Sequence, residues 1–191
     1  AVLERVQQHW LGRQQRRHPR AEQASECRLV VGLVNIHAQL LEQRPLHAAA
    51  QMLDTSPGGA RLLCDKEQAG QLAVGQLVLL LTASDTPTLA LVRWRHLNSQ
   101  GLHLGLRYLK GLPRPAWLRR APSAQTHPGI LQSTPAPGNG WHHGLWLPNG
   151  QFVEGENVWL QLASANNQRA LPLPTINLST SAVTRYPLQL A

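Results

Sequence analysis

Short apolar stretches separated by turn residues constrain the fold of this chain more than any other feature. Between residues 27 and 109 the apolar runs are short, and Gly, Asn, Asp or Pro stands between one run and the next. Short strands at this spacing are typical of small antiparallel barrels. We therefore predict a mainly all-β fold with a small six-stranded antiparallel barrel and short flanking helices. The expected strands cover residues 27–33, 48–53, 60–64, 76–81, 88–96 and 101–109.

The segments around these strands predict helices and a linker. Residues 1–12 carry apolar side chains at helical spacing up to Gly12, which predicts a short N-terminal helix or linker. Residues 35–47 are ambiguous, because Ile36 could begin a helical turn that Pro45 ends. Residues 113–120 suggest one helical turn behind the barrel. Residues 121–140, rich in Pro, Ser, Thr, Gly and Asn, predict a linker.

The C-terminal region, residues 141–191, is also expected to be rich in β-strands. Pro148-Asn149-Gly150 marks a hairpin turn within it. The region is either a second small barrel or an extension packed on the first, and the sequence leaves both open. The expected strands cover residues 141–147, 151–162, 169–173 and 181–190. The predicted division is therefore 1–12, barrel domain 13–120, linker 121–140 and C-terminal region 141–191.

The composition indicates a globular protein with an excess of arginine. Hydrophobic residues make up 42% of the chain, enough for a packed core, and the formal net charge is +8. Of the 18 Lys and Arg residues, only Lys66 and Lys110 are lysine. Guanidinium groups suit bidentate contacts with phosphate or guanine. The overall excess also fits a composition bias of the source genome, so only the local arginine cluster bears on function.

Several classes of protein are not expected from the sequence. No apolar run approaches the ~20 residues that cross a bilayer, and the N-terminus lacks the apolar core of a signal peptide. We therefore expect no membrane insertion. Cys27 and Cys64 are predicted to be buried free thiols, so we expect a cytoplasmic location. His142 and His143 point to opposite faces of a strand, so we expect no metal site. No nucleophile–base pair stands out, so we expect no enzyme.

Two motifs carry the functional signal. A basic cluster precedes the first expected strand and a polar turn joins the second and third. The basic cluster is Arg16-Arg17-His18-Pro19-Arg20, with Arg13 three residues earlier, and the turn is Asp54-Thr55-Ser56-Pro57-Gly58-Gly59. Taken alone, the first could be a solvated or nonspecific nucleic-acid-binding tail, and the second a plain hairpin turn.

Together the motifs complement different edges of a guanine nucleotide. Arginine bonds guanine O6 and N7 bidentately, and its fork also binds phosphate oxygens. Asp54 and Ser56 supply acceptors for the donors at guanine N1 and N2. Gly58 and Gly59 permit positive φ and a close approach of the backbone to a ligand. The two motifs therefore predict a site for a guanine dinucleotide.

Residues 13–112 resemble the PilZ family, bacterial receptors for cyclic di-GMP. The family carries RxxxR before its first strand and [D/N]xSxxG between its second and third. Arg16 and Arg20 match the first motif, although Arg13 and Arg17 form a second register, and Asp54, Ser56 and Gly59 match the second. Val92-Arg93-Trp94 and Gly101 to Leu106 resemble the family's closing strands. The gap between the motifs is longer than in compact members.

The resemblance implies a PilZ-type barrel whose ligand is cyclic di-GMP, with no further cofactor. The ligand-binding residues are then Arg16, Arg17, Arg20, Asp54, Ser56, Gly58 and Gly59, with Arg13, Trp94 and Arg107 as further candidates. Trp94 and Arg107 could instead be structural, since a tryptophan on a strand is commonly part of the core.

We expect a receptor that changes conformation on nucleotide binding and signals to an upstream domain or a protein partner. The alternative is a degenerate PilZ barrel that acts as a protein-interaction module without nucleotide binding. A basic barrel that binds RNA or DNA ranks last, because few aromatic side chains suit base stacking. We therefore expect no specific nucleic-acid partner.

Overall fold

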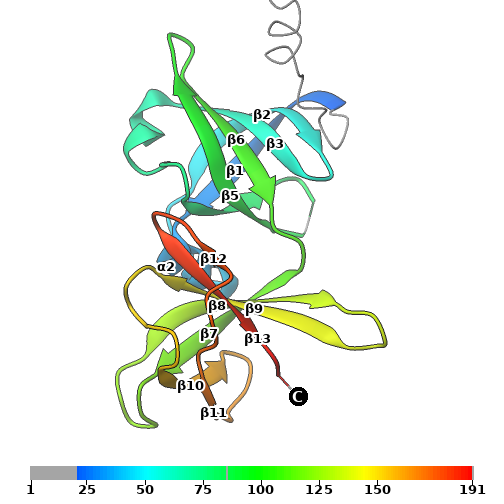
Figure 1. Ribbon diagram of the computed structural model, residues 1–191. Coiled ribbons are helices and arrows are strands. Elements are labelled where there is room, and N and C mark those ends of the chain that lie inside the picture. The colour runs from blue at the N-terminus through cyan, green and yellow to red at the C-terminus, as the bar shows by residue number, and fades with distance from the viewer. Residues whose placement is uncertain (1–20, 85, 191) are drawn as a thin grey trace, which may run out of the picture.

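The computed structural model describes residues 21–84 and 86–190. The chain forms a closed six-stranded antiparallel barrel and a separate seven-stranded sheet, and Figure 1 shows the sheet packed beneath the barrel. Short helical elements connect the strands. The predicted all-β fold with a six-stranded barrel is therefore confirmed. The helix expected at residues 1–12 lies outside the described residues.

The barrel is built from the first six strands in the order β1-β2-β3-β6-β5-β4. Every neighbouring pair is antiparallel. A short 3₁₀ helix, η1 (Lys66–Gly70), connects β3 to β4. The strands are β1 (Ala21–Val31), β2 (Ala48–Ser56), β3 (Gly59–Cys64), β4 (Leu77–Leu81), β5 (Thr88–Leu97) and β6 (Leu102–Tyr108).

Alternate residues of these strands fill the barrel interior, as the period of a β-strand requires. Leu29, Leu62 and Leu104 are fully buried there. Cys27 and Cys64 belong to the same interior cluster. Both are free and buried, which confirms the prediction of unpaired thiols.

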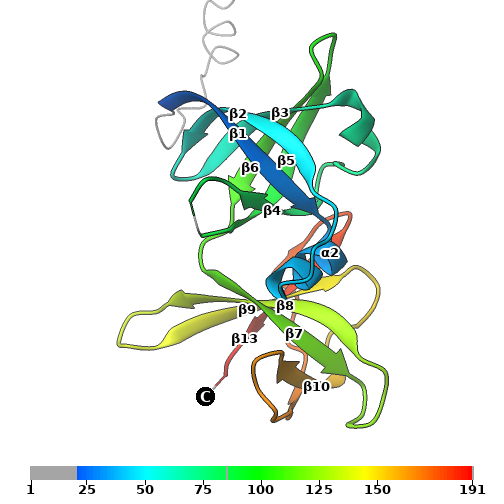
Figure 2. The same cartoon turned by 180° about the vertical axis from the view of Figure 1, so that it is seen from behind.

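Helix α2 (Leu33–Leu40) follows β1 after a single residue, Gly32. Gly32 has φ +87°, a conformation that favours glycine, and it turns the chain from the barrel wall into the helix. The helix lies between the barrel and the second sheet (Figure 2) and buries Leu33, Ile36 and His37 there. The helical turn expected from Ile36 is thus present and ends before Pro45.

The second sheet begins directly after the barrel. It is open rather than closed, with the strand order β11-β10-β7-β8-β9-β13-β12. The β8–β9 hairpin extends away from the body of the molecule in Figure 1. The strands are β7 (Leu112–Arg119), β8 (His127–Pro135), β9 (Trp141–Pro148), β10 (Asn157–Leu162), β11 (Arg169–Pro172), β12 (Leu178–Ser179) and β13 (Val183–Leu188).

Two sequence predictions are wrong in this region. Residues 113–120 were expected to form a helical turn, but residues 113–119 belong to β7. Pro113 and Pro115 disfavour a helix, and they lie in the part of β7 that pairs with β8 but not with β10. Residues 121–140 were expected to be a linker, yet they contain β8. The second sheet therefore includes residues from 112 onward, and it is not a second closed barrel.

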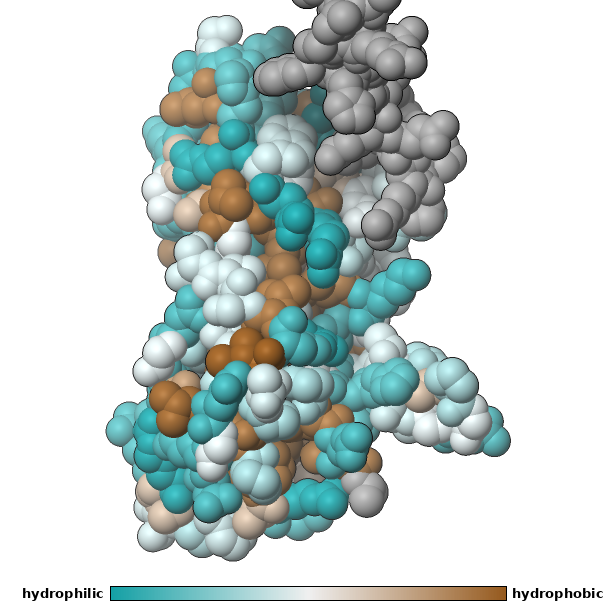
Figure 3. Space-filling view, in the orientation of Figure 1, coloured by the Kyte–Doolittle hydropathy of each residue, from teal (hydrophilic) through white to brown (hydrophobic). Residues whose placement is uncertain are grey.

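The barrel and the second sheet share one apolar core. Leu79 and Leu89 from the barrel pack in the same cluster as Ile36 of α2 and Trp146 and Val183 of the sheet. A further cluster, with Leu131, Leu145 and Tyr186 among its members, is built by the sheet itself. On the face shown in Figure 3, apolar residues form a band from the barrel onto the sheet, between hydrophilic side chains.

Candidate functional site

The first described strand begins beside the polar turn. Arg13, Arg16, Arg17 and Arg20 lie outside the described residues. Strand β1 begins at Ala21, the residue that follows Arg20, and Ala21 pairs with Thr55 of the polar turn. Because consecutive Cα atoms are about 3.8 Å apart, the covalent chain fixes only how far the Cα of Arg20 lies from that of Ala21.

The polar turn is a tight hairpin between β2 and β3. Ser56 pairs with Gly59, so Pro57 and Gly58 are the two turn residues. The Ser56 hydroxyl accepts a hydrogen bond from the Gly58 N–H at 3.3 Å and donates one to the Gly59 carbonyl at 3.3 Å. The Gly58 carbonyl accepts from the N–H of Tyr108 at 3.0 Å. The turn is thus fixed both by its own side chain and by β6.

Glycine is required at 59 for a different reason from the one expected. Neither Gly58 nor Gly59 is among the described glycines with positive φ. A Cβ on Gly59 would lie 2.0 Å from the backbone carbonyl oxygen of Leu106. The hairpin therefore needs this glycine so that it can pack against β6.

The strand register aligns several candidate residues in one row across four strands. Asp54 of β2 pairs with Arg61 of β3, Arg61 pairs with Gly105 of β6, and Gly105 pairs with Trp94 of β5. Directly paired residues present their side chains on the same face of a sheet. The row therefore places Asp54, Arg61 and Trp94 on one face of the barrel.

Two β-bulges direct this row to the outer face. In β2 the register shifts between Met52 and Asp54, and in β5 it shifts between Val92 and Trp94. Met52 and Val92 belong to the barrel interior. Without the bulges, Asp54 would face inward like Met52, two residues before it, and Trp94 would face inward like Val92.

Asp54 is held within the protein. Its carboxylate Oδ2 lies 2.9 Å from Nε of Arg61, and the Asp54 side chain is only 8% exposed. The Nε–H does not point at a hydrogen-bond acceptor, so the contact is an ion pair rather than a hydrogen bond. The Arg61 side chain is 43% exposed, which leaves its remaining donors accessible from outside the barrel.

Trp94 and Arg107 complete the outer face. Trp94 is 40% exposed, so it is not part of the core. Its indole lies against Gly105, where a Cβ would come within 1.9 Å of the Trp94 Nε1. Arg107 is exposed and pairs with Gly59 of the hairpin. The face therefore combines a flat aromatic ring with two guanidinium groups beside the polar turn.

The sequence analysis missed Arg61. It lies two residues after Gly59 on the same strand, and its backbone partner across the hairpin is Asp54. The two-residue turn between Ser56 and Gly59 was the available signal, because it fixes which residues of the two strands face each other. The bulge at Leu53 adds a shift that the sequence does not show.

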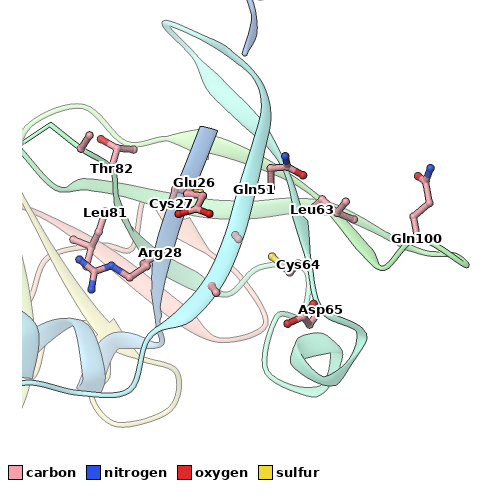
Figure 4. Close-up of a pocket in the computed structure, with 13 residues that line it drawn as sticks. Glu26, Cys27, Arg28, Gln51, Leu63, Cys64, Asp65, Leu81, Thr82 and Gln100 are labelled. Carbon is pink, nitrogen blue, oxygen red and sulfur yellow. The ribbon is translucent and has the colours of Figure 1, made fainter. Parts of the chain in front are cut away.

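A larger hollow lies elsewhere on the barrel (Figure 4). It encloses about 830 Å³ and is open to solvent along β1, β2 and β3. Glu26 and Asp65 contribute carboxylates to its lining, and Arg28 contributes one cation. None of the predicted site residues lines it. Its mixed charge makes it less suited to an anionic nucleotide than the arginine-bearing outer face.

The remaining candidates for chemistry are structural in the described part of the chain. His142 is exposed, whereas Nδ1 of His143 lies 2.8 Å from the buried Ser133 hydroxyl, to which Arg114 donates a hydrogen bond of 3.1 Å. Burial lowers the pKa of His143, assisted by Arg114. No His, Cys, Asp or Glu residues within 21–84 and 86–190 form a group of three that could hold a metal ion.

No described helix has the length and apolar character needed to span a membrane. No protein-family model, curated protein or solved structure matched this chain. The functional argument therefore depends on the residues and on their arrangement in the barrel.

Proposed function

We propose that this protein is a PilZ-type receptor for cyclic di-GMP, which binds on the outer face of the barrel. The observation that carries the proposal is the strand register. It aligns Asp54, Arg61 and Trp94 in one row, with the polar turn alongside and the arginine motif attached one residue before β1. The polar turn and the aromatic ring are thereby on one face of the barrel, and β1 begins beside that turn at the residue that follows Arg20.

Each part of this face matches a part of the ligand. Arg16 and Arg20, with Arg17 and Arg13 in support, bind the phosphates and the O6 and N7 edge of guanine. Asp54 orients Arg61 through their ion pair, and its carboxylate is the acceptor that the motif assigns to guanine N1 and N2. The exposed indole of Trp94 provides a flat surface on which a base can stack.

The fold also supports transmission of a binding signal. Strand β1 starts beside the polar turn and leads through Gly32 into α2, and α2 packs on β7, β8 and β9 of the second sheet. A ligand that repositions the start of β1 thus acts on an element that touches the second sheet. The recipient of the signal is an adjoining domain or a protein partner in bacterial second-messenger signalling.

Calorimetric titration with cyclic di-GMP tests the proposal. We expect micromolar affinity, about −8 kcal/mol, for the parent chain. A charge-assisted hydrogen bond is worth roughly 1.5–3 kcal/mol, so Arg20→Ala and Arg16→Ala should each weaken binding by roughly tenfold to hundredfold. Asp54→Asn, which keeps the side-chain shape, should also weaken it. Arg44→Ala is the matched control, because Arg44 is exposed on the loop after α2.

One observation favours the alternative, a protein-interaction module without nucleotide binding. Asp54 is already ion-paired with Arg61 and largely buried, so part of its acceptor capacity is used within the protein. Absence of heat from the parent chain would favour this module over the receptor, whereas equal affinity in the Arg20→Ala and Arg44→Ala variants would contradict the role of the arginine motif.

A further inference from the structure

A second basic site lies where the barrel meets the second sheet. A pocket of about 370 Å³ opens there, between the end of β6 and strand β13. Pockets of this size hold small organic molecules. Its lining residues are Arg107, Tyr108, Leu109, Lys110, Gln132, Trp146, Asn177, Leu178 and Arg185. We call it the junction pocket.

The junction pocket is positively charged and lacks a counter-charge within the described residues. Arg107, Lys110 and Arg185 line it, and no Asp or Glu of the described chain does. The ion pairs seen in residues 21–84 and 86–190 join Arg61 to Asp54 and Arg120 to Glu156, so they involve none of these three cations. Three cations that share one pocket repel one another, and an anion between them would remove that repulsion.

Arg185 is placed in the pocket by the shape of the neighbouring strand. It is half-buried on β13, opposite Trp146 of β9. Its guanidinium lies against Gly144, where a Cβ would come within 2.3 Å of Nε. Burial lowers the pKa of Arg185, which reflects the cost of holding this charge away from water. Gly144 thus leaves the space that the guanidinium occupies.

The back wall of the pocket is fixed by hydrogen bonds. The Gln132 side chain accepts from the indole N–H of Trp146 at 2.9 Å and donates to the backbone carbonyl of Lys110. Gln132 is 4% exposed and Trp146 is fully buried. The segment between the barrel and the sheet is thereby tied to β8 and β9. This part of the pocket lining is therefore preorganised, which limits the entropy lost on binding.

We propose that the junction pocket binds the phosphate group of a small phosphorylated organic molecule. Arg107 and Lys110 come from the end of the barrel, and Arg185 comes from the second sheet. A phosphate accepts hydrogen bonds from all three, and the apolar side chains of Leu109 and Leu178 contact the organic part. The ligand therefore bridges the two halves of the molecule. Arg107 also lies on the outer face proposed for cyclic di-GMP, so the variants that test the junction pocket are made at Lys110, Arg185 and Gly144, which are not part of that face.

Titrations of the intact chain with phenyl phosphate, inorganic phosphate and phenol test the proposal, with calorimetry and the arginine Nε–H signals in NMR as readouts. We expect saturable binding of phenyl phosphate, weaker binding of inorganic phosphate and no binding of phenol. Arg185→Gln and Lys110→Gln should each weaken phenyl phosphate binding by about tenfold or more. Arg44→Gln, which removes an exposed charge elsewhere, should leave the affinity unchanged.

Gly144→Ala moves the charge of Arg185 within the pocket without removing it. The new methyl group would displace the flexible end of Arg185, so the chain should fold normally but bind phenyl phosphate as weakly as Arg185→Gln. Equal affinity of the parent, Arg185→Gln and Gly144→Ala, or non-saturable shifts of all arginine signals, would overturn the junction pocket. Cyclic di-GMP is absent from these titrations, so their outcome is independent of the dinucleotide experiment.

Discussion

At Gly59 the β2–β3 hairpin approaches strand β6 more closely than any side chain would allow. The residue pairs with Arg107, and the space for its Cβ is occupied by the carbonyl oxygen of Leu106. Gly59 is therefore needed because the hairpin packs closely on β6. The sequence analysis had instead expected it to be needed for a positive φ. The motif serine is similar, because its hydroxyl bonds within the turn. These residues shape the site before any ligand is considered.

Gly59→Ala should destabilise the barrel, because the Cβ would meet a backbone atom that cannot rotate away. Overpacking of this kind typically costs about 1–3 kcal/mol in the free energy of unfolding. Urea denaturation followed by circular dichroism measures it. Gly70→Ala is the matched control, since nothing lies within 4 Å of a Cβ at Gly70. Equal stability of the two variants would contradict the close packing of the hairpin on β6.

At the scale of elements, most strands could be predicted from the sequence, but their register could not. Alternating apolar residues and turn residues are local signals, so the expected strands from residue 48 to residue 109 agree with β2 to β6. The bulges beside Asp54 and Trp94 depend on pairing with β3 and β6, which the sequence does not encode locally. For this reason a tryptophan that could have been part of the core lies on the outer face.

The same strands bring the two cysteines close together inside the barrel. Cys27 and Cys64 both pair with Ala50, from β1 and β3 respectively. Burial raises the pKa of Cys27 to about 11, and burial with the nearby Cys27 and Asp65 raises that of Cys64 to about 12. The folded state thus favours the neutral thiols.

These thiols should make the barrel sensitive to alkaline pH. Their contribution to stability is complete below pH 9.0, the ordinary thiol value, and is lost as pH rises toward about 11 and 12, because the unfolded thiols ionise first. The free energy of unfolding measured between pH 8 and pH 11 should therefore fall less steeply in a Cys27→Ala, Cys64→Ala double variant. Tyr186, with a raised pKa, remains in both proteins and supplies a residual slope. If the free energy of unfolding falls equally steeply with pH in the parent and in the double variant, the two thiols are not the source of the alkaline sensitivity.

At the scale of the whole molecule, the barrel and the second sheet are joined by α2 and a shared core. His37 lies at the centre of this junction and is 3% exposed. Its Nε2 lies 3.0 Å from the Ala116 carbonyl, and its ring meets Trp117 edge-on at 4.3 Å between centroids. Burial lowers the pKa of His37, opposed by that hydrogen bond. The neutral ring is therefore part of the packed junction.

Acid should loosen this junction. His37 stabilises the folded state above its ordinary pKa of 6.5, and the contribution is lost as pH falls through its lowered pKa, because a buried ring resists protonation. His37→Gln, which keeps an N–H donor, should show a smaller loss of unfolding free energy between pH 7 and pH 5 than the parent. His142→Gln, at an exposed position, should behave like the parent. The same pH dependence in all three proteins would contradict this role.

The sequence by itself determined the strand-rich character of the chain, the barrel strands β2 to β6, the buried thiols and the polar turn, because alternation and turn chemistry act over a few residues. The first strand was expected at 27–33, but β1 is Ala21–Val31 and Leu33 begins α2. Only the tertiary structure decided that residues 112–135 join the second sheet and that Asp54 and Trp94 face outward. Those outcomes depend on pairing between strands distant along the chain. Such pairing is fixed by the cooperative packing of the whole molecule, which no local pattern of residues records.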